Sequence, residues 1–159
     1  GYNKLFRKYI KKMRITYSSL LYPTVNVKIT NETDDNNEYY NKFMHYWESL
    51  YENKKHFHFF MDLKSLTRPN LGLCIDFINR QKKLKESPIQ YLDYSIVVVD
   101  NVIVKNILNV IWRICPPLNT VYLVGETVLA TALLSKLNDE MLSIQYVDAY
   151  LEIFNITKI

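Results

Sequence analysis

Apolar and polar residues alternate near the start of the chain in a pattern typical of β-strands. Val25, Val27 and Ile29 are separated by single residues, and β-branched side chains favour extended backbone. The segment from Arg14 onward is also rich in apolar residues and is separated from this run by Pro23. The pattern predicts a strand over 25–29, preceded by a hairpin partner or edge strand, with Pro23 at the break.

The clearest helical pattern follows a polar stretch and covers residues 37–53. Large apolar residues recur there at spacings of three and four, which places them on one side of a helix. These residues are Tyr40, Phe43, Met44, Trp47, Leu50 and Tyr51. We expect this aromatic stripe to pack in the core of the protein.

Later parts of the chain alternate between continuous apolar runs and helical spacing. Nearly continuous apolar runs are typical of strands buried on both faces, and they cover residues 56–63, 94–99 and 120–124. Helical spacing predicts helices over 69–84, 102–114, 126–137 and within 141–154. Asp100 or Asn101 is expected to cap the helix that begins at 102.

Strands that alternate with helices and are joined by short corners indicate βαβ units. The sequence therefore predicts an α/β fold: a single compact domain with a mixed, mostly parallel sheet of four or five strands and four to five helices. We place this domain at 15–159, after a basic N-terminal arm at 1–14.

The composition agrees with one globular domain. The chain has 159 residues, of which 48% are hydrophobic and 23% are charged. No apolar run approaches the roughly 20 residues that span a bilayer, and no secretion signal is recognised. Cys74 and Cys115 lack metal-ligand or CxxC spacing, so we expect reduced thiols in an intracellular, cytoplasmic protein.

The positive charge is concentrated in the N-terminal arm. Residues 1–14 carry six bases and no acid; removing these six from the twenty bases of the chain leaves fourteen against sixteen acids. Apolar residues of the arm recur at helical spacing beside its bases, which include Lys4, Arg7, Lys8, Lys11 and Lys12. This arm can contact an acidic partner or a membrane surface, or pack on its own core. Nucleic acid is disfavoured because the body is slightly acidic.

Asp62 stands at the end of an apolar strand, where α/β proteins bind ligands. Its carboxylate can bind a cation or a partner, or it can accept backbone N–H bonds in the corner or pair with Arg68. We favour the structural role because no second acid, base or nucleophile is close to it in sequence.

Catalytic and metal-binding signals are weak. His56 and His58 are two residues apart on one predicted strand, but a metal site needs three or four ligands. The chain has three glycines and no GxGxxG, GxxxxGK, GxSxG or HExxH motif. We therefore expect no catalytic activity, cofactor or metal. An unrecognised enzyme would need Asp62, His58 and Asp100 to converge in one pocket.

The segment "FFMDLKSLTRPNLGLCIDF" resembles the STAS family, typified by bacterial anti-sigma-factor antagonists. Its strand ends in Asp-Leu, a loop follows, and the next helix starts at Leu-Gly-Leu. This looks like the strand of that family that ends in Asp-Leu-Ser and is followed by a loop and a Gly-Leu-Gly helix start. The order of strands and helices over 15–137 is also similar, and a more distant likeness links the chain to the CRAL-TRIO fold. In signalling members the loop carries an Asp-Ser-Ser triplet whose serine is phosphorylated, and this chain has Arg68, Pro69 and Asn70 there.

The resemblance implies a non-catalytic protein–protein interaction module that binds another protein or a second copy. It places the partner-binding corner at Asp62, Lys64, Ser65, Thr67, Arg68 and Asn70. A composition typical of AT-rich genomes would suit a viral or scaffold component. The alternative function is a binder of a lipid or other small apolar ligand at a membrane surface.

Overall fold

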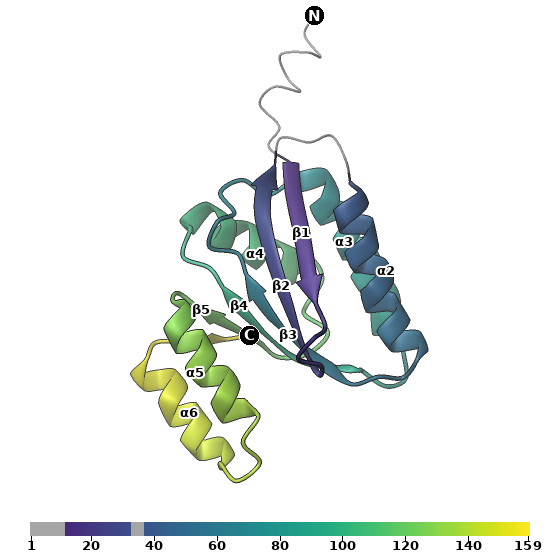
Figure 1. Cartoon of the computed structure of the whole chain (residues 1–159). Helices are drawn as coiled ribbons and strands as arrows, with labels where there is room; N and C mark the ends of the chain where they lie inside the picture. Colours follow the sequence, from purple (N-terminus) through teal and green to yellow (C-terminus); the bar gives the residue numbers. More distant parts are fainter. Residues whose placement is uncertain (1–11, 33–36) are drawn as a thin grey trace, which may run out of the picture.

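The computed structural model describes residues 12–32 and 37–159, in which a six-stranded sheet is packed against helices (Figure 1). The first two strands, β1 (Lys12–Ser18) and β2 (Thr24–Glu32), form an antiparallel hairpin. Its turn contains Pro23 after a cis peptide bond. The predicted hairpin is confirmed, but β1 begins at Lys12. Residues 12–14 therefore belong to the sheet and not to the predicted arm.

The central strands are parallel and adjacent, as the apolar runs predicted. They are β2, β3 (Phe57–Asp62), β4 (Leu92–Val98) and β5 (Val121–Val124). The helices that connect them are α2 (Glu38–Glu52), α3 (Leu71–Lys85) and α4 (Val102–Ile114). The α/β fold class is therefore confirmed. A short strand not predicted, β6 (Thr157–Lys158), pairs antiparallel with β5.

Strand order in the sheet follows the order in the chain. Right-handed crossovers that advance in one direction place their helices on one face of the sheet, and α2, α3 and α4 lie together on that face (Figure 1). Two later helices, α5 (Thr127–Leu137) and α6 (Ile144–Ile153), cover the opposite face near β4 and β5. The molecule has three layers at β4 and β5 but two layers at β1 and β2.

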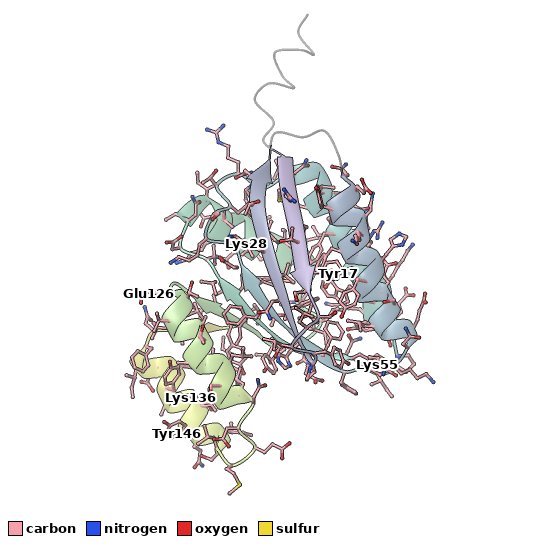
Figure 2. The ribbon with its side chains drawn as sticks, viewed as in Figure 1. Tyr17, Lys28, Lys55, Glu126, Lys136 and Tyr146 are labelled. Atoms are coloured by element: carbon pink, nitrogen blue, oxygen red, sulfur yellow. The ribbon has the colours of Figure 1, made fainter. Side chains whose placement is uncertain are left out.

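Each face of the sheet has its own apolar core. Beneath α2, the rings of Phe43, Trp47 and Phe59 contact one another, with Trp47 and Phe59 centroids 4.8 Å apart. On the opposite face, Ile96 and Val98 pack with α5 and α6. Lys136 of α5 lies over the ring of Tyr146 of α6, at 5.4 Å, which links the two helices (Figure 2).

Helix starts follow local hydrogen bonding. Of the two predicted caps for α4, it is Asn101 whose side chain accepts a bond from the Val104 backbone N–H.

Tyr17 projects from the edge strand β1 toward α2 and stacks on Tyr46, with the ring centroids 4.6 Å apart (Figure 2). None of the helices in the described residues is long and apolar enough to cross a membrane.

Candidate functional site

The predicted corner between β3 and α3 lies at the carboxyl ends of the parallel strands. Two buried leucines, Leu63 and Leu66, anchor it and pack with Val99 and Val104 near the start of α4. The Leu63 backbone N–H also donates to the Val98 carbonyl, at 2.9 Å. The corner is therefore held against both β4 and α4.

Asp62 takes the structural role that we favoured for it. Its carboxylate accepts a hydrogen bond from the Lys64 backbone N–H at 3.0 Å, which closes a local turn. The alternative ion pair with Arg68 does not form in the described part of the chain. Lys28 on β2 is the neighbour of Asp62 in the strand register. Both residues lie on the sheet face that α5 and α6 cover at β4 and β5 but not at β2.

Asn31 fixes the middle of the corner from the end of β2. Its side-chain oxygen accepts bonds from the Thr67 N–H at 2.9 Å and from the Thr67 hydroxyl at 3.0 Å. Its amide group donates to the Arg68 carbonyl at 2.8 Å. Asn31 was not among the predicted site residues, because its partners lie 36 and 37 positions away in the sequence and no local pattern connects them.

Asn70 begins α3 by capping it. Its side-chain oxygen accepts a bond from the Leu73 N–H at 3.2 Å. A Cβ atom at Gly72 would lie 3.3 Å from this oxygen, so a larger residue there would require the capping side chain to shift by a few tenths of an ångström. Three of the predicted residues make hydrogen bonds that hold the corner together: Asp62, Thr67 and Asn70. The other three have exposed side chains: Lys64, Ser65 and Arg68.

The outer surface of α3 and α4 adds apolar side chains to this corner. Six of these residues are between 51% and 68% exposed. We call this surface the α3–α4 face: Leu71, Ile75, Val102, Ile103, Val110 and Ile114. The seam between the helices is closed, because Cys74 and Ile78 of α3 pack with Ile107 and Ile111 of α4.

Charges around the α3–α4 face are mostly basic. Helix α4 contains Lys105 and Arg113 and no acid, and α3 ends with Lys82, Lys83 and Lys85. The one acid of α3, Asp76, accepts a hydrogen bond from the Tyr40 hydroxyl at 2.5 Å and pairs with Arg80 at 3.0 Å. This acid therefore adds little negative charge to the outer surface.

The two neighbouring histidines bind different partners. His56 precedes β3 and pairs with Asp93 at 2.8 Å. His58 is buried, shares a hydrogen bond with the Thr24 hydroxyl and stacks on Tyr94 at 4.6 Å. Burial lowers the pKa of His58, which favours its neutral ring. No group of three or more possible metal ligands occurs in the residues that the structure describes.

The minimum requirement for an unrecognised enzyme was convergence of His58, Asp62 and Asp100. His58 and Asp62 are four residues apart on one strand, which corresponds to about 13 Å at a typical strand rise. His58 is also enclosed by Thr24 and Tyr94. The fold therefore does not bring these three side chains into one small pocket.

The predicted basic arm falls largely outside the described part of the structure. Lys4, Arg7, Lys8 and Lys11 all lie in residues 1–11, and Lys12 is the first residue of β1. The suggested contact of the arm with an acidic surface or a membrane stays a prediction.

Family models, curated proteins and solved structures were compared with the chain, and none of the three comparisons found a match. The resemblance to the STAS family therefore stays a prediction. Three features of the described residues bear on function: the corner, the α3–α4 face and the interior beneath them.

Proposed function

We propose that this chain is a non-catalytic interaction module whose α3–α4 face, with the exposed side chains of the corner, binds another protein. The observation that carries the proposal is the set of six apolar side chains exposed together on two neighbouring helices. The resemblance to the STAS family implies a role of the same kind.

These apolar residues are separate from those that hold α4 on the sheet. Val104 and Ile111 are buried on the inner side of α4, at 1% and 7% exposure. Ile103, Val110 and Ile114 follow one another at helical spacing on a neighbouring side and remain more than half exposed. Extended exposed apolar patches in soluble proteins commonly mark interaction sites.

The charges favour an acidic, amphipathic helix of another protein as the occupant. At the corner end the exposed bases Lys64 and Arg68 are accompanied by Asp100, just before α4. At the other end the helices carry Lys82, Lys85 and Arg113 beside one acid, Glu86, so this end is clearly basic. A second copy docked face to face would bring these positive charges together. An apolar helix stripe flanked by Asp and Glu satisfies both the apolar side chains and the bases.

The experiment compares two double variants of the full chain as bait in quantitative pull-downs from native cells. Val110→Asp/Ile114→Asp changes the α3–α4 face, and Val128→Asp/Ile144→Asp is a matched control on the exposed surface of α5 and α6. A candidate partner is one lost with the first variant and retained with the second. Urea unfolding of both variants checks that each remains folded.

The acidic segment of that partner is then made as a peptide and titrated against each purified protein. We expect the α4 double variant to weaken binding by at least about tenfold, because it places acids opposite acids and removes two apolar anchors. Peptide binding that is equal in all three proteins overturns the proposal. Self-association through this face, or binding to anionic lipid vesicles but to no peptide, also overturns it.

A second candidate function, binding of an apolar ligand, is favoured by a cavity of about 130 Å³ in the interior. Sites for drug-sized ligands measure roughly 300–1,000 Å³. A complete lipid tail therefore exceeds this cavity, and the alternative is restricted to much smaller molecules.

A further inference from the structure

The cavity lies between the sheet and the three helices on its first face. Its volume is about 130 Å³. Side chains from β1 to β4, the corner and all three helices line it, among them Ile29, Met61, Leu66, Leu73, Cys74 and Leu108. It sits beneath the corner fixed by Asn31, at the carboxyl ends of the parallel strands, where α/β folds commonly bind ligands.

The lining is almost entirely hydrocarbon and carries no charged side chain. Of its three side chains with N–H, O–H or S–H groups, Tyr40 directs its hydroxyl to Asp76, Cys74 carries a thiol and Trp112 carries an indole N–H. Burial raises the pKa of the Cys74 thiol, so this group stays uncharged near neutral pH. A ligand in the cavity would meet dispersion contacts and no partner for a charge.

Native interiors contain few voids larger than a water molecule. Water is held in a buried site by two to four polar partners, and this lining, which is mostly hydrocarbon, offers few of them. An engineered apolar cavity of about 150 Å³ in another protein stays dry and binds benzene. The cavity here has a similar volume and a similarly apolar lining, and it is partly open to the surface.

We propose that this cavity is a binding site for a small, uncharged apolar molecule of about the size of benzene. This inference rests on the second candidate function and specifies its ligand. It is independent of the proposed docking function, because the cavity lining and the α3–α4 face share no residue. Bound ligand would stabilise the packing of α3 and α4 against the sheet, since both helices contribute to the lining.

The test uses benzene as the probe and follows thermal unfolding of the full chain. Leu108→Phe adds a ring to the cavity lining and is expected to fill much of the space. Val110→Phe places the same ring on the exposed side of the same helix and serves as the matched control. Benzene at ten times its Kd should raise the Tm of the wild type and Val110→Phe by about 3–6 °C. Leu108→Phe should show little or no shift.

Equal shifts in all three proteins would place benzene elsewhere and overturn the proposal. The absence of a shift in the wild type would overturn it as well.

A second measurement tests the proposal if Leu108→Phe does not fold. Methyl methanethiosulfonate, a neutral thiol reagent, is applied to the wild type with and without benzene, and mass spectrometry assigns the modified cysteine.

Cys74 lines the cavity, and Cys115 lies outside it and contacts the Pro116 carbonyl. Benzene at ten times its Kd should slow modification of Cys74, by up to about tenfold, since bound benzene occupies the space beside this thiol. Cys115 reports general opening of the fold, so the ratio of the two rates isolates the cavity. An unchanged ratio overturns the proposal.

Discussion

Helices α2 and α4 cover the same face of one sheet but differ in the residues that they expose on their outer surfaces. Helix α2 buries a broad aromatic and apolar stripe and exposes mainly polar residues such as Asn41, Lys42 and His45. Helix α4 buries Val104 and Ile111 and still exposes four aliphatic side chains. Packing on the sheet therefore buries nearly all the apolar surface of α2 but only part of the apolar surface of α4.

The interior beneath the two helices also differs. Beneath α2, Phe59 contacts the rings of Phe43, Trp47 and Phe57 at 4.8–5.7 Å between centroids. The cavity of about 130 Å³ also borders α2 at Tyr40 and Phe43, but most of its helical lining comes from α3 and α4. One end of the layer is therefore closely packed for stability, and the other end leaves apolar surface free both inside and outside. Both proposals concern this second end.

The largest expected effect tests the close packing beneath α2. Phe59→Ala removes a fully buried ring from the aromatic cluster and should lower the free energy of unfolding by about 3–5 kcal/mol. Leu108→Ala, beside the cavity, should cost less because that side chain is half-buried and already borders empty space. Urea unfolding of both variants measures the difference. Equal losses would show that the two ends are packed alike.

A smaller effect distinguishes how the two helices begin. The Asn101 side chain accepts the Val104 N–H at 3.1 Å, and Asn37, at the start of α2, makes no side-chain cap bond. Asn101→Ala should therefore cost about 1 kcal/mol, and Asn37→Ala only a few tenths. Chemical denaturation of the two single variants provides the comparison. A larger loss at Asn37 would contradict the difference between the two helix starts.

The smallest expected effect on stability concerns the outer surfaces. Val110→Ser and Asn41→Ser both change exposed helix positions, so each should alter the free energy of unfolding by no more than about 0.5 kcal/mol. Their surfaces should respond differently to a fluorescent hydrophobic dye. Dye binding is expected to fall for Val110→Ser and to stay unchanged for Asn41→Ser. An equal response would remove the distinction between the two outer faces.

The secondary structure was largely predictable because hydrophobic spacing is a local signal. The helix predicted over 102–114 has those bounds in the structure, and the runs at 56–63, 94–99 and 120–124 contain or overlap the parallel strands β3, β4 and β5. Strand β6 was not predicted, since two residues are too few for any periodic pattern. Its pairing depends on β5 being close in space.

The candidate site was less predictable than the fold. The corner was located from the acid that follows an apolar strand, and its exposed members, Lys64, Ser65 and Arg68, are among the predicted residues. Asn31, which holds the corner, was missed. The outer face of α4 was also missed, because an apolar helix in an α/β sequence is ordinarily assigned to the core.

The amino-acid sequence alone determined the type and order of the helices and strands, because each depends on spacing among residues close along the chain. The apolar stripe predicted for α2 is buried as expected. Only the tertiary structure decided which apolar residues of α3 and α4 stay exposed, how Asn31 reaches Thr67 and Arg68, and where a cavity remains. These features depend on contacts between distant segments and on how volumes fit together. A linear pattern records neither the distances between its segments nor the space left between their side chains.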